Sequence, residues 1–229
     1  MFWINTPIGM ALMVLAMLLA FGSQLKMQGA YQKYRAMRVR SGRTGADVAR
    51  ELLSHAGISD VRVEEVAGTL TDHYDPRTRT VRLSREVYSG SSVAALGVAA
   101  HETGHALQHQ EGYAPLALRS AILPLAGFGS SAAFPLFIAG LFFNNVLFMD
   151  IGILLFAGAV LFQIVTLPVE FNASTRAVEL LSAGGYVTRE EEEPVKNMLR
   201  AAGYTYLAAT AVALANLLRL VLLRGSRRD

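Results

Sequence analysis

The sequence predicts a mainly α-helical integral membrane protein, with three to four transmembrane helices and a small α+β aqueous portion. Only 17% of its 229 residues are charged, against about 25% in ordinary soluble domains. The charges are also segregated, because four long stretches contain no Asp, Glu, Lys or Arg: residues 1–25, 120–149, 151–169 and 201–218. The other segments carry the charge density of a soluble protein. Membrane-spanning and aqueous segments are therefore expected to alternate along the chain.

The composition excludes several other classes of protein. With no Cys there can be neither a disulfide scaffold nor a metal site built from thiolates. The net charge of +3 is modest, and the basic residues are not interleaved with a recognisable nucleic-acid-binding motif. We therefore expect the lipid bilayer as a partner, and no nucleic acid.

Residues 1–25 are predicted to form the first transmembrane anchor, since about 20 apolar residues cross a bilayer. A cleaved signal peptide is the alternative. It is disfavoured because the start, MFWINTPIGM, has no positively charged region and the apolar run exceeds about 7–15 residues.

The second and third spans are predicted at Ala121–Phe143 and Ile151–Val169, within residues 120–169. Only Asn144–Asp150 separate them, so the two helices should form a hairpin across the membrane.

The fourth apolar segment, Tyr204–Leu223, contains Arg219 and opens the basic C-terminal region 204–229. Most basic residues lie in 26–119 and 170–203, so the positive-inside rule places both segments in the cytoplasm of a multi-pass cell-membrane protein. A fourth helix that crosses fully would carry its arginines to the opposite side. It therefore either crosses against the rule or lies partly in the membrane interface.

Two helices of the aqueous portion are predicted from their end signals. Thr44 can cap a helix that closes at Gly57. A longer helix begins at Ser91 or Ser92 and runs to about Gln110.

Two short strands are predicted between these helices, at Val61–Val66 and Thr80–Leu83. The segment DHYDPRT between them carries turn chemistry at Asp75-Pro76.

Residues 101–105 read HETGH, within the longer predicted helix. His101 and His105 lie four residues apart on one helix face, about 6 Å apart along the axis, so both imidazoles can reach one zinc ion. Glu102 projects beside that ion, where it can take a proton from an attacking water. The alternative is a helix that displays two surface or packed histidines.

A third ligand must come from elsewhere in the chain. His109 lies about 12 Å from His101 along the axis, so it is expected to be a supporting or surface residue. Asp150 is excluded by its place on the opposite membrane face. Glu170 is the best candidate, at the end of the third span where a new helix is expected to begin, because a carboxylate at an apolar edge is costly without a partner. The alternative is an ion pair between Glu170 and Arg176.

Four segments together resemble the YugP-like neutral zinc metallopeptidases, membrane gluzincins that are distantly similar to HtpX-type proteases: SGRTGADVAREL, VRVEEVAGTLTDHYDPRTRTVRLS, AAHETGHALQH and PVEFNASTRA. The resemblance implies a zincin-like (minigluzincin) catalytic portion and one Zn²⁺ per chain. Carried over residue by residue, it implies that His101, His105 and Glu170 bind zinc and that Glu102 is the general base.

Two positions depart from this pattern. Ser174 stands where the HtpX-type proteases have Asp, and Asn172 also stands where Asp is expected. The departures put in doubt the residues around the ligands rather than the ligands themselves.

His73 and Tyr74 are candidates for stabilising an oxyanion or positioning the substrate, since they precede a predicted strand. The alternative for His73 is a solvated turn residue. An edge strand beside the HETGH helix would also suit an extended peptide.

The sequence therefore predicts a membrane-bound zinc endopeptidase that cleaves peptide or membrane-protein substrates at the cytoplasmic membrane surface. A catalytically silent, zinc-binding membrane scaffold or regulator is the first alternative. An intramembrane protease of the site-2 type is the second, and it is disfavoured because only the short run VAALGVAA precedes His101.

Overall fold

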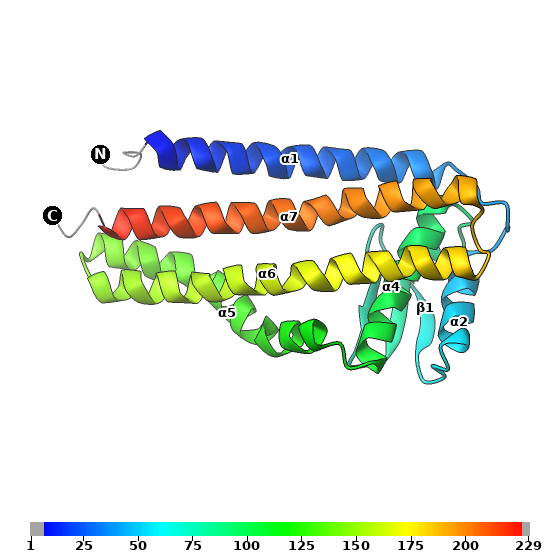
Figure 1. Cartoon of the computed structure of the whole chain (residues 1–229). Coiled ribbons are helices and arrows are strands. Elements are labelled where there is room, and N and C mark those ends of the chain that lie inside the picture. The colour runs from blue at the N-terminus through cyan, green and yellow to red at the C-terminus, as the bar shows by residue number, and fades with distance from the viewer. Residues whose placement is uncertain (1–6, 226–229) are drawn as a thin grey trace. The chain divides into compact units, whose positions relative to one another are not determined.

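A computed structural model of the chain describes residues 7–225 and is mainly helical (Figure 1). The elements run in the order α1 (Pro7–Arg35), α2 (Gly45–His55), β1 (Arg62–Val66), β2 (His73–Asp75), β3 (Thr80–Ser84), α3 (Arg85–Tyr88), α4 (Val93–Gln110), α5 (Ala114–Phe142), α6 (Val146–Ala183) and α7 (Arg189–Gly225).

Two compact units share these elements. The apolar unit comprises, among the described residues, 7–24, 117–167 and 205–225. The aqueous unit comprises residues 25–116 and 168–204. The helices α1, α6 and α7 are each divided between the two units, with one part in each.

Four of the described helices are long and apolar enough to cross a membrane: α1, α5, α6 and α7. Large apolar side chains such as Phe128, Leu154 and Leu15 are exposed on these helices, as expected for surfaces that face lipid. The prediction of a mainly α integral membrane protein with a small α+β portion is confirmed, and the number of candidate spans is four.

Glycines allow α5 and α6 to pack closely in the apolar unit. A Cβ atom on Gly129 would lie 2.7 Å from the Leu155 carbonyl oxygen, and one on Gly152 would lie 2.9 Å from that of Ala133. Close backbone approach at small residues is how helices gain packing contacts in lipid, where no hydrophobic driving force holds them together. Phe137, from α5, is buried in the resulting core.

The turn between α5 and α6 is shorter than the predicted loop Asn144–Asp150. Helix α6 begins at Val146, because the Asn145 side-chain oxygen accepts a hydrogen bond from the Phe148 backbone N–H and so caps the helix. Asn144 turns the chain with a φ of 52°. The placement of Asp150 in a loop was therefore wrong, since it lies in the second turn of α6.

Helix α6 also continues through Pro168, so the new helix predicted at Glu170 does not exist. Proline removes one backbone donor, but long helices of membrane proteins tolerate it where neighbouring groups satisfy the freed carbonyl. Glu170 therefore lies inside one helix of 38 residues.

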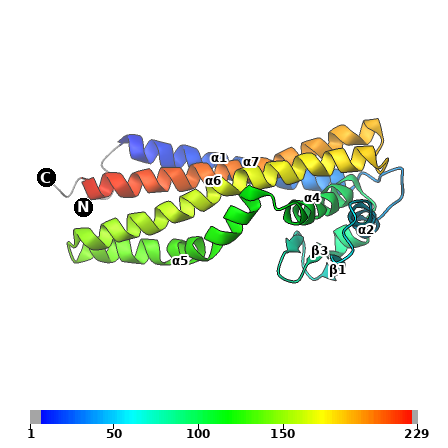
Figure 2. The same ribbon diagram turned by 60° about the horizontal axis from the view of Figure 1, so that its bottom comes forward.

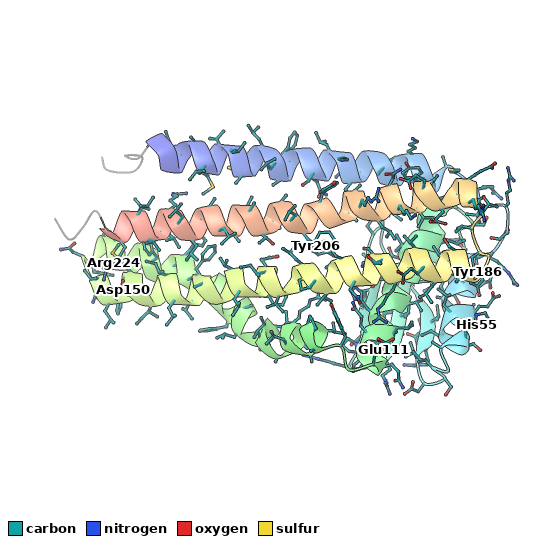
Figure 3. The ribbon with its side chains drawn as sticks, in the orientation of Figure 1. His55, Glu111, Asp150, Tyr186, Tyr206 and Arg224 are labelled. Carbon is teal, nitrogen blue, oxygen red and sulfur yellow. The ribbon has the colours of Figure 1, made fainter. Side chains whose placement is uncertain are left out.

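The last helix packs along α6 within the apolar unit. Arg224, near the end of α7, forms two hydrogen bonds of 2.7 and 2.8 Å with the Asp150 carboxylate (Figure 3). This fork-shaped pairing joins the C-terminal end of α7 to the N-terminal end of α6, so the two helices are antiparallel. One arginine of the basic C-terminal region thus has a carboxylate partner.

The aqueous unit contains a three-stranded sheet with the order β1-β3-β2 (Figure 2). Strand β1 pairs with β3 in parallel, and β2 pairs with β3 in antiparallel orientation. The predicted strands are present within one residue. The turn predicted at Asp75-Pro76 is present, and the edge strand His73–Asp75 (β2), which directly precedes it, was not predicted. Pairing with β3 makes these three residues a strand.

Helices α2 and α4 are capped as predicted. Thr44 and Asp47 form a reciprocal capping box on α2, and the Ser92 hydroxyl accepts a hydrogen bond from Ala95 N–H at the start of α4. Val48 of α2 and Leu96 of α4 are fully buried in a shared core. The aqueous unit therefore has its own hydrophobic core, around the helix that carries HETGH.

Candidate metal centre

His101, His105 and Glu170 lie together in the aqueous unit. One ligand atom from each is within 4.8 Å of the others. The Glu170 Oε2 atom is 3.3 Å from His101 Nε2 and 3.7 Å from His105 Nε2. The two imidazole rings are perpendicular, with centroids 4.8 Å apart. The structure thus brings together the three residues that were predicted to bind zinc.

The helical repeat of α4 and one glycine produce this arrangement. Four residues of α-helix return both histidines to one face. Between them, Gly104 faces α6: a Cβ atom there would lie 3.0 Å from the Ala173 carbonyl oxygen. The missing side chain allows the backbones of α4 and α6 to approach closely, and this brings Glu170 within reach of the histidines.

The Nδ1 atom of each imidazole, the outer nitrogen that lies away from Glu170, also has a hydrogen-bond partner. His101 Nδ1 is 3.2 Å from the Ser174 hydroxyl, and His105 Nδ1 is 2.9 Å from Gln108 Oε1. The Nε2 atoms of both rings therefore face Glu170. Bonds of this kind orient a histidine for metal binding. Ser174, a departure from the resembled pattern, thus contacts one of the two histidines.

Burial and neighbouring negative charge have opposite effects on the pKa of His105. Burial alone favours the neutral ring, but the neighbouring carboxylates of Glu170 and Glu102, together with the bond to Gln108, raise the pKa of His105. Glu170 itself is buried, while His101 is partly exposed. A metal ion would replace the proton that the carboxylate attracts, so its binding should weaken at acid pH.

Glu102 is held by the edge strand of the sheet. Its Oε2 atom accepts a hydrogen bond of 3.0 Å from the Tyr74 backbone N–H. The start of this strand is anchored in turn by Asp72, whose carboxylate accepts bonds from the Ser84 N–H and hydroxyl. The strand therefore fixes the carboxylate that was predicted to be the general base.

His73 does not join the group of ligands. Its side chain is exposed, and its Nδ1 atom is 2.8 Å from the Thr71 carbonyl oxygen. Tyr74, the neighbouring residue, places its hydroxyl 2.8 Å from His109 Nδ1. His109 is thus bonded to the sheet rather than to the group of ligands. A role for His73 in catalysis stays a prediction.

The alternative ion pair between Glu170 and Arg176 is not what the structure shows. The Arg176 guanidinium forms a two-pronged ion pair with Glu111, with bonds of 2.7 and 2.6 Å. Its Nε–H also donates to Asn172 Oδ1 at 2.8 Å. Arg176 is therefore engaged on the side of α6 that faces the end of α4.

The donor set fits zinc. Two imidazoles and one carboxylate are typical ligands of catalytic zinc sites, where three protein ligands leave one position open. Ligand atoms about 2.0–2.2 Å from a tetrahedral zinc ion lie about 3.3–3.6 Å from one another. The separations of 3.3 and 3.7 Å from Glu170 Oε2 are close to this spacing, and all three ligand atoms lie within 4.8 Å of one another.

Sequence reasoning missed Gln108 and the Tyr74 backbone N–H. Gln108 is fully buried and lies one helical turn after His105. Its spacing is a usable signal, because a polar residue three positions after a metal-binding histidine can reach the outer imidazole nitrogen. The Tyr74 N–H carries no such signal, since backbone groups are the same at every residue.

Comparison with known proteins extends this picture. A family model described as "Putative neutral zinc metallopeptidase" matches residues 9–225. The chain belongs to this family. It is also 48% identical, over 218 residues, to the "Putative membrane protease YugP" of Bacillus subtilis (strain 168). That similarity covers 95% of this chain and 97% of its relative. No solved structure matches.

Family membership agrees with the resemblance found in the sequence. The match spans both units, so it includes α4 with HETGH and the part of α6 that contains Glu170. The intramembrane alternative receives no support from the structure, because α4 is not among the helices of the described chain that are apolar and long enough to cross a membrane.

Proposed function

We propose that the chain is a membrane-bound zinc endopeptidase that hydrolyses peptide bonds in peptide or membrane-protein substrates. One observation carries the proposal: His101, His105 and Glu170 place their ligand atoms within 4.8 Å of one another, and Glu102 follows His101 directly on α4. Three ligands of this kind suit a catalytic site rather than a closed structural one.

The residues divide the chemistry between them. Zinc, when bound by the three ligands, supplies Lewis-acid chemistry that polarises a carbonyl and activates water. Glu102 accepts the proton of the attacking water and passes it to the leaving amine nitrogen. The Tyr74 N–H keeps the Glu102 carboxylate in place.

We first expect that the purified, full-length chain contains one zinc ion and cleaves casein. A zinc chelator should abolish cleavage, because the activated water is lost, and added zinc should restore it. Metal analysis and a cleavage assay on the same sample test this expectation. Zinc at one ion per chain with no cleavage of casein or of membrane-protein substrates would instead support the silent scaffold. A chain without zinc would contradict both functions.

We further propose that the aqueous unit faces the cytoplasm. This unit holds 16 of the 21 Lys and Arg residues of the chain, and basic residues are retained on the cytoplasmic side. The apolar unit holds the turn at Asn144 and the C-terminal end of α7. Both of these are then expected on the outer side.

Labelling of single cysteines tests this orientation without background, since the chain has no Cys. In intact cells, a membrane-impermeant maleimide should label Phe143→Cys and Gly225→Cys but not Ser59→Cys. After permeabilisation, all three exposed positions should react. Labelling of Ser59→Cys in intact cells would reverse the orientation, and protection of Gly225→Cys would place the end of α7 on the cytoplasmic side.

A further inference from the structure

A continuous set of hydrogen bonds leads from the surface of the aqueous unit to His105. We call it the Gln108 relay; it comprises Glu111, Arg176, Asn172, Gln108 and His105. The surface end is the ion pair between Glu111 and Arg176 (Figure 3 labels Glu111). The inner end is the bond of 2.9 Å between Gln108 Oε1 and His105 Nδ1. The relay runs from Glu111, at the C-terminal end of α4, to two residues of α6 and back to two residues of α4, so it also joins these two helices.

The direction of each bond follows from the donors and acceptors available. A guanidinium group can only donate, so Asn172 must present its oxygen to Arg176. That same oxygen lies 2.9 Å from Gln108 Nε2, and so it accepts a bond from the Gln108 amide N–H as well. The Val169 backbone carbonyl, which can only accept, takes the second amide N–H at 2.9 Å. Two separate acceptors, Asn172 Oδ1 and the Val169 carbonyl, thus fix the orientation of the Gln108 amide.

This orientation decides where His105 carries its proton. Because both amide hydrogens of Gln108 are used, the atom facing His105 is the carbonyl oxygen Oε1. An oxygen acceptor requires a proton on Nδ1 of the neutral ring. The lone pair then lies on Nε2, which faces Glu170 Oε2 at 3.7 Å.

We propose that Gln108 is a positioning residue, which fixes the proton of His105 on Nδ1 and thereby reserves Nε2 for the metal ion. Asn172, held by the pair of Arg176 and Glu111, assists it. The proposal rests on the proposed function only in assigning zinc to His105. It also explains the Asn at position 172, since an amide oxygen accepts both bonds just as the expected Asp would.

The two histidines differ in how strictly their hydrogen-bond partners fix the tautomer. Gln108 is fully buried, so no solvent can replace its bond to His105. The partner of His101 is the Ser174 hydroxyl at 3.2 Å, and a hydroxyl rotates to donate or to accept. Ser174 therefore does not impose a tautomer on His101, and its removal should have the smaller effect.

The relay is tested by measuring the zinc affinity of the whole chain in detergent, in competition with a chromophoric chelator. Gln108→Met, which keeps the volume but loses the acceptor, should raise the Kd for zinc about 10–100-fold. Asn172→Leu should raise it less, about 10-fold, because the Val169 carbonyl still orients Gln108. Asn172→Asp should restore affinity to within about 3-fold of the unmodified chain, since a carboxylate accepts both bonds. The exposed Gln32→Met is the matched control and should leave the Kd unchanged.

Nuclear magnetic resonance of ¹⁵N-histidine-labelled protein supplies a readout that does not depend on zinc. At a pH where His105 is neutral, the metal-free chain should show the Nδ1–H tautomer for His105, and Gln108→Met should show a mixture of both. His105→Asn assigns the signal. An unchanged tautomer in folded Gln108→Met would overturn the relay, as would an unchanged Kd. If the unmodified chain binds no zinc, the proposed function fails, while the tautomer measurement still decides the relay.

Discussion

Replacement of Glu102 by Gln should lower kcat/KM for peptide hydrolysis by about 10²–10⁴-fold, the range that a general base contributes. An amide cannot accept the proton of the attacking water. Its oxygen can still accept the hydrogen bond from the Tyr74 N–H, so the local structure should be retained. Zinc content should therefore stay at one ion per chain. Cleavage kinetics and metal analysis on the same preparation check both parts.

The matched control for this variant is Glu65→Gln, the same chemical change at an exposed position of β1. It should retain the activity of the unmodified chain. If Glu102→Gln retained full activity with zinc bound, another group would have to act as the general base. If it lost zinc as well, the loss of activity would no longer report proton transfer.

Replacement of Glu170 by Ala should cause the chain to lose its zinc. The change removes one of three ligands and leaves only the two imidazoles of α4. Loss of a ligand should weaken zinc binding by more than the 10–100-fold expected for an outer hydrogen-bond partner, so we expect a rise in Kd above about 100-fold. Zinc per chain after dialysis against a weak chelator measures this effect.

Glu179→Ala is the matched control, since Glu179 lies on the same helix but is exposed. It should keep one zinc ion per chain. Full zinc occupancy in Glu170→Ala would remove Glu170 from the ligands, and would leave the two histidines of α4 with a third partner other than this carboxylate.

The sequence predicted the elements whose causes are local. Four charge-free stretches of 18–30 residues marked the apolar parts of α1, α5, α6 and α7, because charges are costly in lipid. The capping box of Thr44 and the cap at Ser92 located the starts of α2 and α4, since the orphan N–H groups of a helix are satisfied by residues next to them. The HETGH spacing placed two histidines on one face for the same local reason.

The errors occurred where distant residues override a local signal. Pro168 suggested a helix end, but α6 continues through it. The Asp75-Pro76 turn signal concealed β2, which exists because β3 is available for pairing. Asp150 was assigned to a loop, yet it lies in α6 and pairs with Arg224, 74 residues later in the chain.

The sequence by itself thus determined which residues can bind the metal, because ligand chemistry and helical spacing are written in a short motif. The tertiary structure decided which groups hold those ligands in place: Gln108 on His105, Ser174 on His101, and the Tyr74 N–H on Glu102. These contacts depend on how α4 is aligned with α6 and with the edge of the sheet. That alignment is set by packing, such as the close approach at Gly104, and no local sequence pattern specifies it.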